Sequence, residues 1–166
     1  MFNRLRKSIA VVCCLVMAVG LTACGDSGSS SPDVDISALV EEMKQTDTSI
    51  PKMSTVTEAS ENAETTFSVL ADFDYAKIEK FVYSYSETGS PEEIAVILTK
   101  EKANVGDLMK ALQAHIDSRR STFKQYDPEQ ASIIEGATLT FQDRYVLLAI
   151  APTSGAMQDI FKKKFS

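Results

Sequence analysis

Cysteine is nearly absent from this chain, and its three cysteines, Cys13, Cys14 and Cys24, all lie close to the N-terminus. From residue 25 onward the sequence contains no thiol. Disulfides, thiolate zinc sites and cysteine nucleophiles are therefore excluded for the rest of the chain, and its stability has to come from packing.

Histidine is equally scarce, since His115 is the only one. This excludes metal motifs that need two histidines and leaves one candidate for imidazole catalysis. At about 100° per residue, His115 falls about 60° from Leu112, at the edge of a helical apolar stripe. Ser118 follows three residues later, with no acid at the spacing of a catalytic triad. We therefore expect a histidine at the boundary of a helix rather than a catalytic base, and we predict no catalytic residue.

The sequence also lacks an excess of positive charge, because 17 Lys and Arg face 23 Asp and Glu, giving a formal net charge of −6. Residues 1–23 hold three cations (Arg4, Arg6 and Lys7) and no acid, so that their removal changes the net charge from −6 to −9. A chain this acidic is not expected to bind nucleic acid or to add an electrostatic attachment to anionic lipid headgroups.

The apolar run near the N-terminus is too short to cross a bilayer. Even taken as residues 8–23, it falls short of the roughly 20 apolar residues that a spanning helix needs, and Gly20 and Thr22 interrupt it. A positive start, an apolar stretch and small residues before Cys24 form the three-part layout of a secretory leader.

Leu21-Thr22-Ala23-Cys24 resembles the processing site of bacterial lipoproteins. The resemblance implies cleavage after Ala23 of a signal peptide at residues 1–23, and lipidation of Cys24, including palmitate. We accordingly expect a lipid-anchored protein of the cell membrane that faces outside the cytoplasm. The alternatives are an ordinary cleaved leader followed by an accidental cysteine, and a signal anchor left in place.

Residues 24–33 follow as a Gly/Ser-rich tether, GDSGSSSPD after Cys24, which cannot bury anything. About nine such residues have a root-mean-square reach of roughly 16 Å. Residues 34–166 are long enough for one globular domain with a core of its own.

Hydrophobic periodicity predicts an α+β domain: two layers, with an antiparallel four-stranded sheet packed by helices in the order α-ββ-α-(α)-ββ-α. The helices are predicted at 35–45, from Asn104 or Asp107 to about 123, at 128–136, and from about 154 onward. The strands are predicted at 81–86, 94–100, 137–142 and 145–151. Residues 45–66 are polar and stay unassigned, as a long loop with a short helix or strand near 65–71.

Several segments taken together are similar to a family of small lipoproteins from Gram-positive bacteria known as the domain of unknown function 4358. The similarity covers roughly residues 36–165 and lies in the segments YSYS at 83–86, PEEIAV at 91–96, STF at 121–123, QYDPE at 125–129 and RYVLL at 144–148. The family usually has Gly-Asn where this chain has Asp143-Arg144, so the turn there is expected to differ. The resemblance implies no activity and no catalytic residue.

Two acidic groups are candidates for chemistry. Glu92 and Glu93 form a carboxylate pair at the mouth of the first hairpin, but neighbouring residues of a strand point to opposite faces and we expect both to be solvated. Asp72, Asp74 and Glu79 could bind Ca²⁺ but lack the spacing and glycine of a calcium loop. We predict neither a metal site nor a cofactor.

The candidate binding surface consists of Tyr83, Tyr85, Arg119, Tyr126 and Tyr145. Phe81, Tyr83 and Tyr85 share one face of a strand, which is either core or a platform for a peptide or glycan. Arg119 lies inside the apolar stripe of its helix, where a guanidinium needs a partner, such as Glu135, Asp127 or helix-end carbonyls, or an anionic ligand.

We thus expect an envelope lipoprotein whose domain is a non-enzymatic binding or accessory module, with an envelope protein as partner in preference to a sugar. The alternative is a carboxylate-based hydrolase that uses Glu92 or Glu93 on cell-wall material. An enzyme needs a pocket where two acids converge, whereas a binding module exposes an apolar or aromatic patch.

Overall fold

The computed structural model describes residues 32–166. The predicted leader at 1–23, Cys24 and most of the predicted tether at 24–33 lie outside the described residues. Within the described part, no helix combines the length and the apolar character needed to cross a bilayer.

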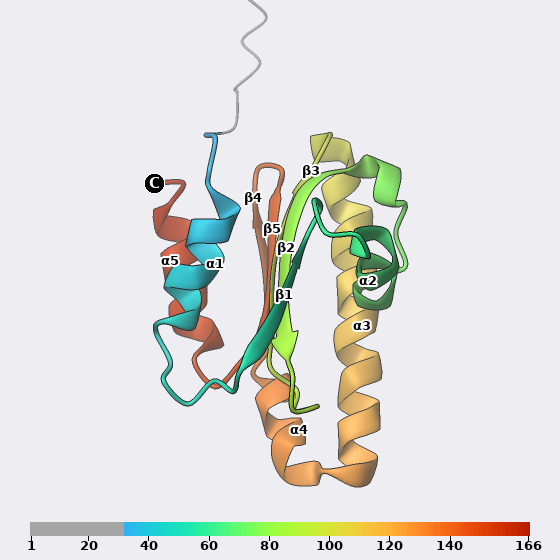
Figure 1. Ribbon diagram of the computed structural model, residues 1–166, viewed down its shortest axis with the longest axis vertical. Helices are drawn as coiled ribbons and strands as arrows, with labels where there is room; N and C mark the ends of the chain where they lie inside the picture. The colour runs from blue at the N-terminus through green and yellow to red at the C-terminus, as the bar shows by residue number, and fades with distance from the viewer. Residues whose placement is uncertain (1–31) are drawn as a thin grey trace, which may run out of the picture. The chain divides into compact units, whose positions relative to one another are not determined.

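One antiparallel sheet of five strands forms the centre of residues 32–166, with the spatial order β1-β2-β3-β5-β4 (Figure 1). Its strands are β1 (Met53–Thr57), β2 (Ile78–Ser86), β3 (Glu93–Thr99), β4 (Thr138–Gln142) and β5 (Tyr145–Ile150). The helices are α1 (Ile36–Lys44), α2 (Ala63–Leu70), α3 (Val105–Tyr126), α4 (Pro128–Glu135) and α5 (Ser154–Lys163), with short 3-10 turns η1 (Tyr75–Lys77) and η2 (Lys102–Asn104).

The predicted number of four strands is wrong because β1 adds a fifth at the edge of the sheet. Val56 is the only buried residue of this strand, which lies in the polar stretch 45–66 and lacks the apolar alternation that marks a strand. For the region near 65–71, the helical alternative is confirmed by α2, whose Phe67 and Leu70 are fully buried.

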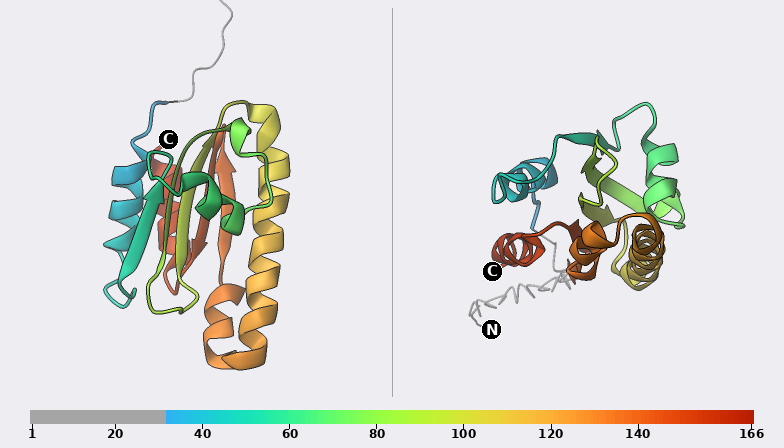
Figure 2. Two further views of the ribbon diagram at one scale, coloured as in Figure 1. Left: turned by 45° about the vertical axis from the view of Figure 1, so that its right-hand side comes forward. Right: turned by 90° about the horizontal axis from the view of Figure 1, so that it is seen from below.

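The predicted two-layer arrangement is also wrong, since helices cover both faces of the sheet. In Figures 1 and 2, α1 and α5 lie on one face, and α2, α3 and α4 lie on the other. Two separate hydrophobic clusters correspond to these faces. Every residue of β3 and β5 is buried, as expected of central strands covered from both sides, whose apolar runs are continuous rather than alternating.

The predicted faces of β2 are confirmed. Phe81 and Tyr83 pack toward α2 and α3, while Val82 packs toward α1 and α5. On the face of Val82, Ser84 is fully buried, and its hydroxyl lies 2.7 Å from that of Thr55 on β1.

Local signals in the sequence account for several helix ends. The Asp35 carboxylate accepts the amides of Ser37 and Ala38 at the start of α1, both at 3.0 Å. Pro128 opens α4, the Asp127 side chain accepts the Gln130 amide, and Gly136 follows the last residue. Asn104 precedes α3 without a side-chain cap, and Asp107 lies in its first turn.

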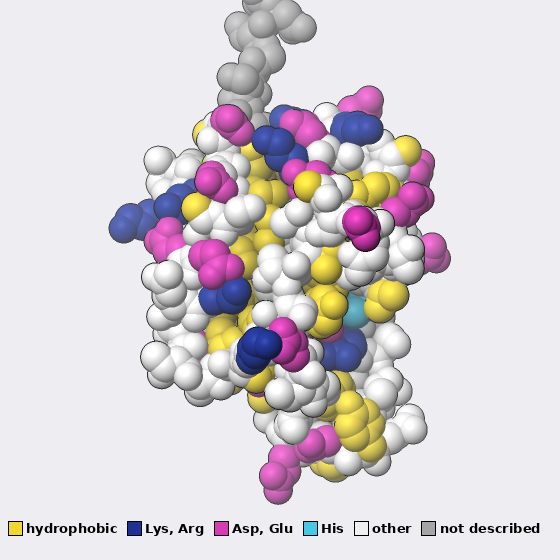
Figure 3. Space-filling view, in the orientation of Figure 1, with side chains coloured by type: hydrophobic (Ala, Val, Ile, Leu, Met, Phe, Trp, Pro, Cys, Tyr) yellow, Lys and Arg dark blue, Asp and Glu magenta, His cyan; other side chains and the backbone are white. Residues whose placement is uncertain are grey.

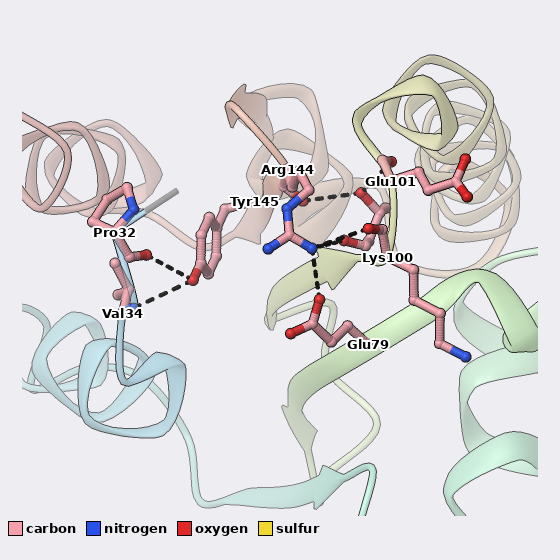
Figure 4. A network of polar contacts seen from close by, with 8 residues as sticks. Pro32, Val34, Glu79, Lys100, Glu101, Arg144 and Tyr145 are labelled. Carbon is pink, nitrogen blue, oxygen red and sulfur yellow. Dashed lines mark hydrogen bonds and ion pairs between the residues drawn. The ribbon is translucent and has the colours of Figure 1, made fainter. Parts of the chain in front are cut away.

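The turn between β4 and β5 anchors two neighbouring segments (Figure 4). Asp143 has a φ of +51°, a conformation that glycine adopts more readily. Arg144 Nη1 donates to Glu79 Oε2 at 2.6 Å and to the Thr99 carbonyl at 2.9 Å. The Tyr145 hydroxyl donates to the Pro32 carbonyl at 2.9 Å and accepts the Val34 amide at 3.3 Å, so the start of the described chain is bound to the first residue of β5.

Candidate functional site

A cavity of about 380 Å³ opens on the sheet face that carries α2 and α3, beside the turn between β2 and β3. Its walls combine two tyrosines, a carboxylate, a histidine and an arginine with small turn residues. In Figure 3 the single histidine (cyan) lies in a recess between hydrophobic side chains (yellow), next to a cationic side chain (dark blue). The lining residues are Val69, Tyr83, Tyr85, Ser86, Gly89, Ser90, Glu93, His115, Ser118 and Arg119.

Glu93 is the polar centre of this cavity. It is the first residue of β3, and its side chain lies on the same face as Ala95 and Ile97, toward α3. His115 Nε2 lies 2.6 Å from Glu93 Oε2, and Arg119 Nε lies 3.0 Å from Glu93 Oε1. His115 and Arg119 can both reach this carboxylate because residues four apart on a helix share one face.

The expectation that Glu92 and Glu93 are solvated is wrong. Their exposed fractions are 7% and 3%; Glu93 is the first residue of the central strand β3, which helices cover on both sides, and Glu92 directly precedes it. The Oε2 atom of Glu92 has no hydrogen-bond partner among the described residues, and Glu92 does not line the cavity. The two carboxylates therefore do not converge on one site.

Arg119 is held by three contacts, and its partner is an acid as predicted, although this acid is Glu93 and neither Glu135 nor Asp127. Besides the ion pair with Glu93, its Nη2 donates to the Ser90 carbonyl at 3.4 Å, and its guanidinium lies 5.0 Å from the centre of the Phe123 ring. Of the predicted partners, Glu135 pairs instead with Lys124 at 3.0 Å, and Asp127 caps α4. The stripe on α3 indicated a buried arginine, but only the packing of α3 on β3 determines its partner.

Tyr83 and Tyr85 form the wall opposite α3, with ring centres 5.2 Å apart. Burial raises the pKa of the Tyr83 hydroxyl, and the negative charge of Glu93 raises it further. A second, mainly apolar hollow of about 280 Å³ shares Val69, Tyr83 and Tyr85 with the first cavity and adds Thr65 and Thr66. We call the two hollows together the α2–α3 groove.

The structure brings together only part of the predicted binding surface. Tyr83, Tyr85 and Arg119 line the groove. Tyr126 is 62% exposed at the end of α3, next to Phe123, and Tyr145 is buried on the opposite face of the sheet. Neither of these two tyrosines is part of the groove.

The groove also contains residues that sequence reasoning missed. Val69 is 71% exposed on α2, and Gly89 adopts a φ of +79° in the turn between β2 and β3. The sequence Thr88-Gly89-Ser90-Pro91 indicated a turn, but nothing in it indicated that the turn closes one end of a cavity. Two of the three acids considered for Ca²⁺ serve elsewhere, since Asp74 caps η1 and Glu79 pairs with Arg144.

The chemistry available in the groove favours recognition. Glu93 is the only acid among the residues that line it, and it is engaged from both sides by His115 and Arg119. Within residues 32–166, no three His, Cys, Asp or Glu side chains are grouped so as to hold a metal ion. A pocket with an aromatic wall and a few fixed polar groups is typical of a ligand site.

Comparison with protein families matches residues 52–151 to the family described as a domain of unknown function (DUF4358). The matched range contains all five strands together with α2, α3 and α4, and so includes the groove. It is shorter than the range 36–165 expected from the sequence. No curated protein and no solved structure matches the chain.

Proposed function

The chain belongs to the DUF4358 family, a domain of unknown function, and from this premise we propose that it is a membrane-anchored envelope lipoprotein whose domain binds another envelope component through the α2–α3 groove. The observation that carries the proposal is the groove itself, in which an ordered Arg119 faces the wall formed by Tyr83 and Tyr85. Sites with an apolar wall and a few fixed polar groups are typical of ligand binding.

The sequence before the domain supports the proposed location. Three cations, an uncharged apolar run and Leu21-Thr22-Ala23-Cys24 match the order of a lipoprotein leader. Two acyl chains bury enough methylene groups, at about 0.8 kcal/mol each, for an effectively permanent anchor.

The geometry of the acids favours binding over the alternative of a carboxylate-based hydrolase. Glycoside hydrolysis ordinarily uses two carboxyl groups about 5 to 9.5 Å apart on either side of the scissile bond. The groove offers Glu93 alone, and this carboxylate is already paired. Glu92 is buried outside the groove.

Photo-crosslinking in intact cells tests the binding role. A photoreactive residue at position 69 should capture a discrete partner, because Val69 is exposed at the rim of the groove. The same residue at position 163, exposed on α5 on the opposite face, is the matched control. The product from position 69 should disappear when Tyr85→Ser is added. Identical products from positions 69 and 163 would contradict the proposal.

Metabolic labelling tests the anchor separately. The wild-type protein should incorporate an alkyne-bearing palmitate analogue, and its mature N-terminus should be Cys24. The Cys24→Ala variant should incorporate none. Labelling that persists in this variant, or a mature protein that begins elsewhere with an unmodified sulfur, would refute lipidation at Cys24.

A further inference from the structure

Arg119 is fixed in position while part of its hydrogen-bonding capacity remains free. A guanidinium has five N–H donors in a rigid fork. Its Nε lies against Glu93, Nη2 donates to the Ser90 carbonyl, and the face of the group lies on Phe123. Among the described residues, no hydrogen bond involves Nη1. The side chain is 29% exposed, and it lines the groove.

The contacts of Arg119 make it a preorganised donor. The Nε–H is not aligned for a hydrogen bond with Glu93, so that this contact is an ion pair that orients the guanidinium. Because Glu93 also binds His115, its charge is shared between two partners. A ligand acceptor that reaches Nη1 therefore meets a donor group that has already lost its conformational freedom.

The other half of the groove is apolar. Val69 is 71% exposed and lies next to the Tyr83 and Tyr85 rings, with Thr65 and Thr66 completing the wall. The surface that lines this hollow is mostly apolar, which favours an apolar side chain as occupant.

We propose that the α2–α3 groove binds the carboxyl end of a peptide, with the terminal carboxylate on Arg119 and an apolar last side chain against Val69 and Tyr85. Guanidinium and carboxylate form charge-assisted hydrogen bonds with matched planar geometry. The Ser118 hydroxyl, on α3 one residue before Arg119, also lines the groove and can donate to the same carboxylate. The proposal rests on the proposed function and specifies its ligand class.

The two hollows have a suitable size for such a ligand. Small-molecule and peptide pockets typically enclose about 300–1,000 Å³. The polar hollow of about 380 Å³ can hold the terminal residue, and the apolar hollow of about 280 Å³ can hold its side chain.

Calorimetric titration of the purified full-length protein in detergent micelles tests this assignment. The probes are acetyl-Ala-Ala-Leu with a free carboxylate, the same peptide as its C-terminal amide, acetyl-Ala-Ala-Ser with a free carboxylate, and the trimer of N-acetylglucosamine. The free leucine peptide should bind at least tenfold more tightly than its amide and than the serine peptide. The saccharide should not bind.

Matched variants show which residues cause the preference for a free carboxylate and for leucine. Arg119→Gln should abolish the preference for the acid over the amide, whereas Arg120→Gln should retain it, because Arg120 pairs with Asp117 on the helix surface. Val69→Ser should reduce the preference for leucine over serine. Circular dichroism checks that each variant is folded, and Arg119→Lys, which keeps the charge, serves if Arg119→Gln is not folded; it should weaken the preference for the acid.

Equal binding of acid and amide, an unchanged preference in the Arg119 variants, binding of the saccharide alone, or no binding of any peptide would each overturn the assignment. The crosslinking result at position 69 is independent of these outcomes. A partner captured there, together with no dependence on a free carboxylate, would retain the binding role and refute the carboxyl-end ligand.

Discussion

Tyr83 and Glu93 illustrate how one buried contact changes the ionisation of its neighbour. Tyr83 is 4% exposed, and both burial and the Glu93 charge oppose formation of its phenolate. The pKa of Tyr83 is therefore raised in the folded protein, while in the unfolded chain it returns to about 10.

The raised pKa of Tyr83 predicts a loss of stability at high pH. Below about pH 10 the phenol keeps its proton in both states, and its contribution is fully present. Above that pH the unfolded chain releases the proton while the folded chain retains it, so the free energy of unfolding falls as pH rises. By pH 11, this single group should lower the free energy of unfolding by about 1.4 kcal/mol.

The measurement compares urea unfolding of the wild type and Tyr83→Phe between pH 9 and 11. The variant should lose less stability over this range. Tyr126→Phe, at a tyrosine that is 62% exposed, should lose as much free energy of unfolding between pH 9 and 11 as the wild type. An equal loss of free energy of unfolding in the wild type and in Tyr83→Phe would contradict the prediction.

At the scale of single elements, α1 shows how a local signal translates into stability. The Asp35 carboxylate accepts two amides of the first turn, which otherwise have no partner within the helix. Asp35→Ala should therefore lower the free energy of unfolding by about 1 kcal/mol. Asp33→Ala, two residues earlier and exposed, should change it by less than about 0.5 kcal/mol. Chemical denaturation of both variants checks this, and equal effects would rule out a special role for the Asp35 cap.

Structural features that depend on neighbouring residues could be predicted from the sequence, whereas those that depend on tertiary packing could not. The start of α1 at Asp35 and the limits of α4 at Pro128 and Gly136 come from signals that lie within one turn. The sequence does not predict β1, because an edge strand with one buried side chain has almost no hydrophobic pattern.

In the candidate site, too, only residues with a local pattern could be predicted. The stripe on α3 identifies Arg119, but its partner Glu93 is distant in sequence, and the sequence predicts a solvated residue there. Only the tertiary arrangement, in which α3 covers one face of β3 and α1 and α5 cover the other, buries Glu93 and selects its partners. The exposed Val69 likewise has no pattern that distinguishes it from any surface valine.

At the scale of the whole molecule, the Tyr145 hydroxyl joins residues 32–34 to the sheet. Tyr145→Phe should remove both hydrogen bonds, leave the Pro32 carbonyl and the Val34 amide without this partner, and lower stability by about 1 kcal/mol. The direct measurement is hydrogen exchange of the Val34 amide in the full-length protein, which should become faster. Tyr126→Phe is the control and should leave that exchange rate unchanged. An unchanged rate in Tyr145→Phe would show that the Tyr145 hydroxyl does not hold residues 32–34.

The groove and the Tyr145 contact lie at opposite ends of the central strands, because Tyr145 pairs with Leu98 at one end of β3 and Ile150 pairs with Glu93 at the other. The length of the central strands therefore separates the groove from the residues that hold the start of the described chain, so that a substitution at Tyr145 can loosen residues 32–34 without altering any side chain that lines the groove.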